Sequence, residues 1–360
     1  MNARPKLITL AAVFFRLGLM GFGGPVALVA LMELETTRSR NWISPSDFLE
    51  RFVICKMLPG PIAFQMALWI GSHVRGVLGA LAAGLSFLLP GAALITLLAM
   101  FYAQVAGVRL GMELIAGMRI GAVVVIWDSA VRLFEPFHRR RPAWLFLLLG
   151  FVMLYVAPSF EPLVILFGGV ASVALRHRTK LFQSPVALLA ALFWVHFKAG
   201  AFTFGTGLAI IPILQRSVVQ VYQWMAEPEF LDAVAFGQIT PGPVTLTSTY
   251  VGFRAGGLVG ACVATLGMYL PGCLVILGLM PLVFPRIKRA QWLPHFSAGA
   301  IPTVIGCIFA ASIGLAASAL TDWRDYLLGA TLLTVSIRLR LVGWKLILLS
   351  ALGYWLLHRI

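Results

Sequence analysis

Two proline-glycine-proline triplets, Pro59-Gly60-Pro61 and Pro241-Gly242-Pro243, each interrupt a long apolar segment. Proline lacks a backbone donor and keeps the residue before it out of helical geometry, so each triplet predicts a broken helix at membrane depth. Non-helical backbone is tolerated there only inside protein or beside a wet cavity. A helix that restarts after the break directs free N–H groups and the positive end of its dipole inward, which suits an anion. A proline kink that merely fits a helix bundle is the alternative.

Two basic side chains precede a second pair of motifs. Arg16 and Lys198 stand before Phe22-Gly23-Gly24-Pro25 and Phe204-Gly205-Thr206-Gly207, where glycine permits either close helix packing or another break. If the hydrocarbon begins near Leu7, Arg16 lies about 14 Å deep. A cation at that depth costs on the order of 3 kcal/mol, so we expect it to face a bound anion or a partner in an internal ion pair.

Lys56 and Gln238 each stand three residues before one of the proline triplets. Both side chains can donate hydrogen bonds to an anion, and Lys56 adds a charge, although a lysine at the end of a half-helix also complements the helix dipole. Neutral donors follow the breaks within about one turn. The predicted substrate-binding set is Arg16, Gly23, Gly24, Lys56, Pro59, Gly60, Pro61, Gln65, Lys198, Gly205, Thr206, Gln238, Thr240, Pro241, Gly242 and Pro243.

The composition indicates which elements position these residues. Of 360 residues, 60% are hydrophobic and 11% charged, whereas a soluble domain has about a quarter of its residues charged. The mean hydropathy is +0.93. The net charge of +15 lies in short clusters between apolar runs, which is the pattern of cytosolic loops and not of a nucleic-acid-binding surface. We therefore predict an all-α, multi-pass membrane protein in contact with lipid and without a nucleic-acid partner.

An internal repeat organises the chain. Sliding the sequence by 182 residues aligns Phe15–Pro61 with Phe197–Pro243, matching glycines, prolines and Trp42 with Trp224. An offset of 181 extends the match to Pro90-Gly91 and Pro271-Gly272. We predict two transport repeats, residues 1–180 and 181–360.

Charge orients the two repeats relative to the membrane. The strongly basic loops, expected in the cytosol, are Arg132–Arg141, Arg176–Lys180, Arg286–Arg289 and Arg338–Arg340. Equivalent loops of the two halves then fall on opposite faces, so we predict inverted repeats. An even number of crossings further requires residues 52–71 and 233–252 to be re-entrant. The predicted fold is about ten full transmembrane helices, with single spans at 7–32 and 185–214, plus the two re-entrant segments, and it places Arg4 and Lys6 outside.

Several functional classes lack support in the sequence. There is no Walker motif, acid-rich metal cluster, or Ser/His/Asp or Cys/His set at a plausible membrane edge. We expect no enzymatic activity, cofactor or metal, and no ATP-driven pumping by this chain alone. Asp128 and Arg132 are spaced as a surface ion pair on a helix.

These motifs together resemble the chromate ion transporters in their two-repeat, single-chain form. The likeness covers nearly the whole chain and rests on Phe15-Arg16-Leu17-Gly18, Phe22-Gly23-Gly24-Pro25, Cys55-Lys56-Met57-Leu58-Pro59-Gly60-Pro61, Thr203-Phe204-Gly205-Thr206-Gly207 and Gly237-Gln238-Ile239-Thr240-Pro241-Gly242-Pro243. The resemblance implies a protein of the cytoplasmic (inner) membrane of bacteria or archaea that expels chromate, coupled to the membrane potential or a proton gradient. The chain departs from the family at Lys56, where glutamine is usual, at Thr206, where glycine is usual, and at Pro90-Gly91 and Pro271-Gly272, where Pro-Ser is common.

The resulting hypothesis is a secondary transporter for a tetrahedral dianion. A dianion that leaves a negative cytosol gains about 4.6 kcal/mol per 100 mV, so export is the favourable direction. Chromate is the expected substrate, while sulfate or another oxyanion remains an alternative because cations and dipoles recognise charge and shape. A lipid-carrier flippase or lipid-phosphate enzyme would also need basic residues in the membrane. A homodimer is compatible with the sequence.

Overall fold

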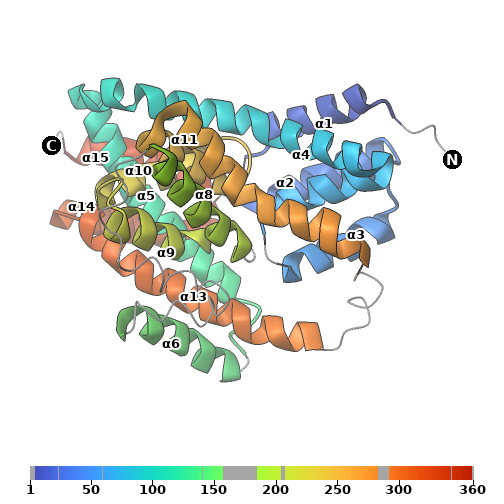
Figure 1. Ribbon diagram of the computed structural model, residues 1–360. Helices are drawn as coiled ribbons and strands as arrows, with labels where there is room; N and C mark the ends of the chain where they lie inside the picture. Colours follow the sequence, from blue (N-terminus) through green and yellow to red (C-terminus); the bar gives the residue numbers. More distant parts are fainter. Residues whose placement is uncertain are drawn as a thin grey trace.

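The computed structural model describes residues 5–22, 24–58, 60–139, 141–156, 185–203, 207–282, 292–341 and 343–358. Within these ranges every regular element is helical and there is no strand. The chain termini lie at opposite ends of the long dimension of the molecule, with α1, α2 and α3 near the N-terminus and α14 and α15 toward the other end (Figure 1). The expectation of an all-α protein is confirmed.

The helices of the two halves follow one another in the same order. The first half contains α1 (Leu7–Met20), α2 (Gly24–Glu33), the π-helical turn η1 (Leu34–Ser39), α3 (Pro45–Met57), α4 (Ile62–Ala106), α5 (Arg109–Phe134) and α6 (Arg141–Val156). The second half contains α8 (Pro185–Ala201), α9 (Ile210–Gln215), η3 (Arg216–Val221), α10 (Glu227–Ile239), η4 (Val244–Leu246), α11 (Thr247–Cys273), η5 (Leu274–Leu279), α13 (Trp292–Ala319), α14 (Trp323–Leu339) and α15 (Gly343–Leu357).

The backbone reproduces the repeat found in the sequence. Adding 182 to the bounds of α3 and η1 gives the bounds of α10 and η3. Asn41 and Gln223, also 182 residues apart, share a left-handed conformation with φ of 51°. The next residue donates its backbone N–H at 2.8 Å in each half, Trp42 to Thr36 and Trp224 to Val218. The two halves therefore fold alike in detail.

Helices α4 and α11 are hairpins rather than straight rods. The chain reverses at Gly76 and Gly257, which have nearly identical dihedral angles (φ 63° and 62°, both ψ −155°). In α11 the hydroxyls of Thr249 and Thr265, 16 residues apart, lie 2.7 Å from each other, whereas a straight helix would separate them by about 24 Å. The short arm of each helix thus packs antiparallel to its long arm.

The segments expected as single spans at 7–32 and 185–214 are each broken. α1 ends at Met20 and α2 begins at Gly24, and the chain turns back so that Arg16 Nη2 lies 2.9 Å from Glu35 Oε1. In the second half, α8 ends at Ala201 and α9 begins at Ile210. The prediction of single spans is wrong, because glycine and proline in the Phe-Gly motifs interrupt the helices.

The reversal at the first Phe-Gly motif also moves the N-terminus. Arg75 Nε donates to the carbonyl of Pro5 at 2.7 Å. Lys6 therefore lies at the same end of the molecule as Arg75, and the prediction that Lys6 stands apart from the basic loops is corrected. Arg4 lies outside the described residues.

Helix α5 defines two ends of the molecule. α15 runs antiparallel to it, with Gly343 against Val125 and Ala351 against Gly117. The turn before α14 therefore lies at the N-terminal end of α5, opposite the turn from α5 to α6, although the two turns are equivalent in the repeats. We call the end carrying Arg75, Arg132 and Arg340 the basic end, and the end carrying Glu113, Glu229 and Asp325 the acidic end.

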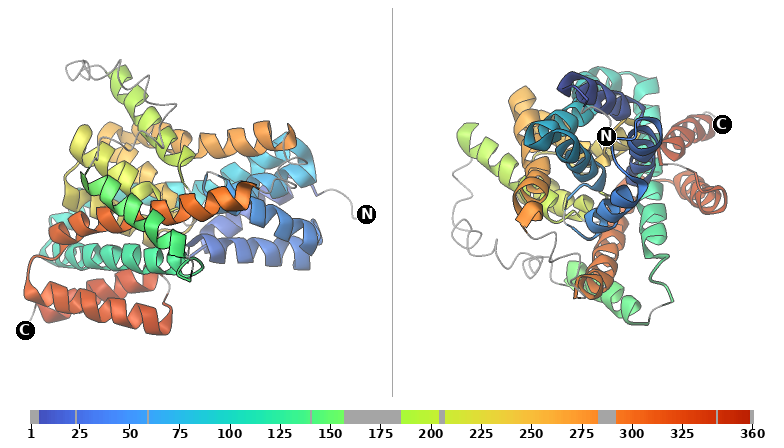
Figure 2. Two further views of the ribbon diagram at one scale, coloured as in Figure 1. Left: turned by 90° about the horizontal axis from the view of Figure 1, so that it is seen from below. Right: turned by 90° about the vertical axis from the view of Figure 1, so that its right-hand side faces the viewer.

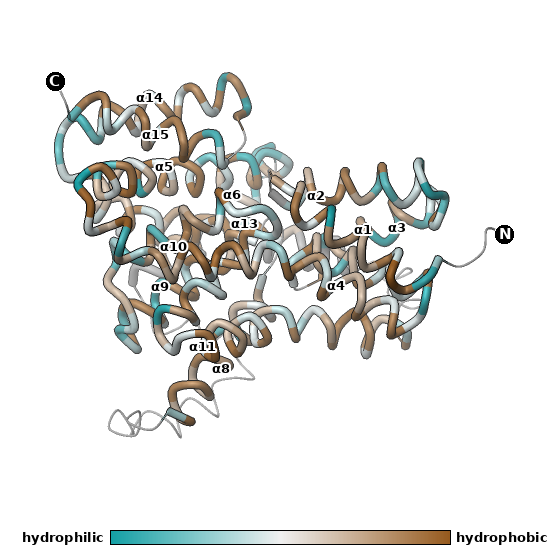
Figure 3. The backbone as a smooth tube through the Cα atoms, turned by 90° about the horizontal axis from the view of Figure 1, so that it is seen from above, coloured by the Kyte–Doolittle hydropathy of each residue, from teal (hydrophilic) through white to brown (hydrophobic). Residues whose placement is uncertain are grey.

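Four helical stretches are long and apolar enough to cross a membrane by length and composition: Ile62–Ala106, Arg109–Phe134, Val244–Leu282 and Ile301–Ala319. Two of these are the hairpins just described. Figure 3 shows apolar residues along most of the backbone, and large apolar side chains such as Leu78 and Leu85 point outward. α14 and α15 pair along one edge, and α8 lies at the opposite edge (Figures 2 and 3). An outer surface of this kind is that of a multi-pass membrane protein.

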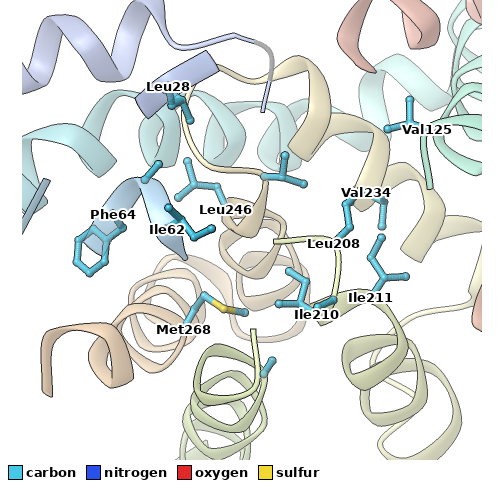
Figure 4. Packing of buried hydrophobic residues seen from close by; sticks show 14 of the residues in the cluster. Leu28, Ile62, Phe64, Val125, Leu208, Ile210, Ile211, Val234, Leu246 and Met268 are labelled. Atoms are coloured by element: carbon cyan, nitrogen blue, oxygen red, sulfur yellow. The ribbon is translucent and has the colours of Figure 1, made fainter. Parts of the chain in front are cut away.

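The core joins the two halves. Ile62 and Phe64 of the first half pack with Leu246 and Met268 of the second in one buried cluster (Figure 4). Trp127 and Phe309, which are separated by 182 residues, contact each other edge to face with their ring centroids 5.3 Å apart. A residue that touches its own repeat equivalent lies next to the pseudo-twofold axis, so the axis passes between α5 and α13.

Candidate functional site

Broken helices of the two halves interlock at the centre of the molecule. The backbone N–H of Gly60 donates to the carbonyl of Thr203 at 2.7 Å, and that of Gly242 donates to Gly21 at 2.9 Å. Both members of the second pair precede those of the first by the repeat offset, taken crosswise. Each proline-glycine-proline turn is therefore held by the Phe-Gly break of the other half.

Glycine is required at both proline triplets. Gly60 and Gly242 have φ of 126° and 107°, a region that other residues rarely adopt. A Cβ on Gly60 would also collide with the amide nitrogen of Gln65. Pro-Gly sequences pack on these turns, since a Cβ on Gly91 would meet the carbonyl of Pro241. The predicted breaks at the two triplets are confirmed as backbone features.

A cavity of about 590 Å³ lies beside the breaks. Residues next to the breaks form its inner wall, and the end of α5 with the turn between α14 and α15 forms its mouth. Its lining includes Pro25, Phe52, Lys56, Ile62, Val125, Asp128, Ser129, Arg132, Pro136, Phe137, Leu208, Gln238, Val244, Ile301, Arg340, Leu341, Gly343 and Trp344. Both halves of the chain contribute, and the mouth lies at the basic end.

Lys56 and Gln238 occupy equivalent positions in the two repeats and line this same cavity. The Lys56 ammonium lies 4.8 Å from the ring centroid of Phe52 and forms no ion pair within the described ranges. The Gln238 amide nitrogen is buried and has no hydrogen-bond partner among the described residues. Two donors without protein acceptors thus face one space, which is what an anion requires.

The mouth of the cavity carries residues that the sequence assigned elsewhere. Arg132 Nε pairs with Asp128 at 2.8 Å, as its spacing predicted, but both side chains line the cavity. Arg132 also donates to the carbonyl of Leu341 at 3.4 Å. Arg340 is largely exposed and lies 3.8 Å from Glu135. The basic loops at 132–141 and 338–340 were visible in the sequence, but their meeting at one cavity depends on the tertiary fold.

The remaining predicted residues are distributed around the breaks. Pro61 caps α4, and Gln65 is fully buried against Gly60. Thr240 donates its hydroxyl to the carbonyl of Phe236, and Pro243 caps η4. Gly24 begins α2. Gly23, Pro59, Gly205 and Thr206 lie outside the described residues.

The structure does not bring Arg16 and Lys198 into the cavity. Arg16 is 58% exposed and pairs with Glu35, which matches the ion-pair alternative considered for it. Lys198 is half-buried on α8 and is not part of the cavity lining. Their spacing from the Phe-Gly motifs located a break but not a common site.

No group of three or more histidine, cysteine or acidic side chains gathers as a metal site within the described ranges. The cavity instead offers cationic and amide donors. Its polar chemistry is therefore that of a binding site for a small anion.

Similarity to known proteins was compared over the whole chain. The Chromate transporter family profile matches residues 8–173 and again residues 190–355. The chain is 29% identical to the Chromate transport protein of Cupriavidus metallidurans, covering 97% of this chain and 94% of the relative. It is 30% identical to the Probable chromate transport protein of Synechococcus elongatus (95% and 91%) and 28% identical to the Chromate transport protein of Pseudomonas aeruginosa (96% and 91%).

No solved structure matches the chain. The double match of the family profile agrees with the repeat seen in the sequence and in the backbone, and the relatives are covered almost end to end. The chain therefore belongs to the chromate transporter family.

Proposed function

We propose that this protein is a secondary transporter that exports chromate, or a related tetrahedral oxyanion, across the cytoplasmic membrane. The observation that carries the proposal is the cavity shared by Lys56 and Gln238, which stand at equivalent positions beside the broken helices. The names of the relatives favour chromate among the oxyanions. The predicted boundary between the repeats near residue 180 is retained.

The charge balance of the cavity favours an anion. Lys56, Arg132 and Arg340 contribute three cations, and Asp128 contributes one carboxylate. Asp128 is engaged by Arg132, so Lys56 and Arg340 leave the cavity positive. A volume of about 590 Å³ is equivalent to roughly twenty water molecules, which accommodates a hydrated dianion. Chromate and sulfate share charge and shape, so this site alone does not separate them.

The positions of the turns support inverted repeats. Equivalent turns lie at opposite ends of α5, and the basic end is assigned to the cytosol by the charge rule. We propose that four hairpins enter and leave the membrane on one side: α1 with α2, α3 with the short arm of α4, and their two equivalents in the second half. This arrangement replaces the two re-entrant segments expected from the sequence, and the cavity then opens to the cytosol.

Export is the energetically favourable direction for this site. A dianion gains about 4.6 kcal/mol per 100 mV when it moves out of a negative cytosol. A cavity that opens to the cytosol presents positive side chains to that dianion before it crosses. The membrane potential can therefore drive export without nucleotide hydrolysis.

The direct test is flux in sealed proteoliposomes that contain the full chain under an imposed potential. We expect chromate flux with competition by sulfate, and no lipid scrambling. Lys56→Gln removes the charge and restores the glutamine usual in the family. Because a hydrogen bond to a charged group contributes about 1.5–3 kcal/mol, the half-saturating chromate concentration should rise roughly 10- to 100-fold.

Lys6→Gln is the matched control, since Lys6 is exposed at the start of α1 and away from the cavity. It should leave the half-saturating concentration unchanged. Lipid scrambling without oxyanion flux would contradict the proposed function. Equal half-saturation in Lys56→Gln and the parent would contradict the assigned site.

A further inference from the structure

A buried ion pair connects the two halves away from the cavity mouth. Arg119 of α5 donates to Asp232 of α10 through two nitrogens, at 2.6 Å and 2.9 Å. The hydroxyl of Tyr102, at the end of α4, donates to the same carboxylate at 2.7 Å. The Asp232 side chain is 0% exposed, and that of Arg119 is 26% exposed. A carboxylate so enclosed is held by the first half of the chain, although it belongs to the second.

This cluster lies between the cavity and the acidic end. Along α5, Arg132 stands at the mouth, Val125 on the cavity wall, and Arg119 beyond both. Along α10, Gln238 faces the cavity and Asp232 lies six residues earlier, about 9 Å toward the acidic end. The same two helices therefore line the cavity and are joined by the ion pair on its far side.

The charged layer continues outward from the ion pair. Arg254 of α11 pairs with Glu229 of α10 at 2.5 Å and lies 5.2 Å from the centroid of the Tyr102 ring. Tyr250 packs against Tyr102 with centroids 6.2 Å apart. Arg119, Asp232 and Tyr102 are thus the innermost layer of a packed region between cavity and solvent.

The repeat provides an internal comparison for this layer. The offset of 182 that relates Trp127 to Phe309 also relates Arg119 to Ile301, and Asp232 to Glu50. Ile301 lines the cavity. An isoleucine cannot form the ion pair, so the basic end lacks the bond that joins the helices at the acidic end, and it is at the basic end that the cavity opens.

We propose that Arg119, Asp232 and Tyr102 form the gate that closes the cavity toward the acidic end. The inference rests on the proposed transport function, because a carrier must open its site to each side in turn. In the present structure the gate is shut and the opposite side is open. Release at the acidic end requires the Arg119–Asp232 pair to separate, which lets α5 and α10 move apart.

The gate can be tested by measuring from which side a thiol in the cavity is reached. Ser129→Cys places a nearly isosteric thiol on the cavity wall, in a full-length chain whose four native cysteines have been replaced. A membrane-impermeant maleimide is applied to either face of sealed vesicles. Asp232→Asn keeps the shape of the side chain but removes its charge, so labelling from the acidic-end face should rise about tenfold or more.

Two variants make the outcome specific. Glu113→Gln changes an exposed carboxylate that pairs with Arg109 on the same helix α5, and it should leave labelling from both faces unchanged. Tyr102→Phe removes one hydroxyl from the gate and should raise acidic-face labelling by a smaller factor, which keeps the test available if Asp232→Asn does not fold. Unchanged acidic-face labelling in folded Asp232→Asn or Tyr102→Phe would overturn the gate.

This measurement needs no substrate. Increased labelling of the Asp232→Asn variant would support the gate even if chromate flux were absent, which would contradict only the proposed function. Normal flux with unchanged labelling would retain the function and remove the gate.

Discussion

At the acidic end of the cavity Arg119 pairs with Asp232, whereas at the basic end the equivalent positions hold Ile301 and Glu50. The surrounding helices are superimposable in their order, their turns and even their unusual dihedral angles. The backbone is thus nearly symmetric while the side chains at this one layer are not. In a symmetric scaffold, a few substitutions of charge for hydrocarbon decide which end is closed at rest.

The chemical difference between the two layers explains their different openings. A buried ion pair with two hydrogen bonds holds its helices together, because separating it leaves two charges to be solvated. Ile301 offers only apolar contact, and part of its surface faces the cavity. The energy needed to separate the helices is therefore higher at the acidic end.

Truncating these two equivalent residues to alanine should give the largest contrast. Arg119→Ala leaves Asp232 buried without its counter-ion, which typically costs about 3–5 kcal/mol. Ile301→Ala removes a half-buried side chain beside an existing cavity and should cost about 1–2 kcal/mol. The free energies of unfolding can be compared in mixed micelles.

The double variant Arg119→Ala with Asp232→Ala serves as the control for this contrast. Since it removes both charges, it should recover part of the loss seen in Arg119→Ala alone. Equal destabilisation by Arg119→Ala and Ile301→Ala would show that the two layers do not differ in the way described.

The next contrast concerns the two proline-glycine-proline turns. Gly60→Ala and Gly242→Ala both force alanine into a positive-φ conformation, at a cost of about 1–3 kcal/mol each. Gly60→Ala should be the more severe, because its new methyl group collides with the Gln65 amide, while that of Gly242 has only Leu246 at 3.2 Å. Unfolding in mixed micelles and chromate flux would both record the order.

Gly278→Ala is the matched control, since a Cβ there meets nothing within 4 Å and the backbone is helical. It should be neutral or stabilising by up to about 1 kcal/mol. An equal loss at Gly60, Gly242 and Gly278 would mean that the turns impose no special conformational demand.

The features predictable from the sequence were those written twice. The triplets at Gly60 and Gly242, and Lys56 with Gln238 before them, recur at a fixed offset, and local chemistry alone requires a break at each. Their meeting at one cavity follows from the way the halves interlock. Gly76 gave no such warning, because a single glycine within an apolar run also fits a continuous helix.

The gate and the cavity mouth were not predictable because they depend on contacts between distant segments. Arg119 and Asp232 are separated by 113 residues, and the repeat breaks down at both positions. Arg16 showed the opposite error, since its depth in a presumed single span implied a buried cation. Once the chain turns back at Gly21, the same residue pairs with Glu35 near the surface.

The smallest net effect should come from exchanging the two residues at the pseudo-twofold axis. Trp127→Phe shrinks a ring and Phe309→Trp enlarges its partner, so each single change disturbs the packing at a cost of about 1–3 kcal/mol. Because the rings are equivalent and in direct contact, Trp127→Phe with Phe309→Trp restores the summed volume around the axis. The double variant should differ from the parent by less than about 1.5 kcal/mol. If the two single effects simply added, the rings would not share one symmetric space, and the axis would have to lie elsewhere. A compensated double variant would instead show that the asymmetry of the molecule is concentrated at Arg119 and Asp232 rather than spread along α5 and α13.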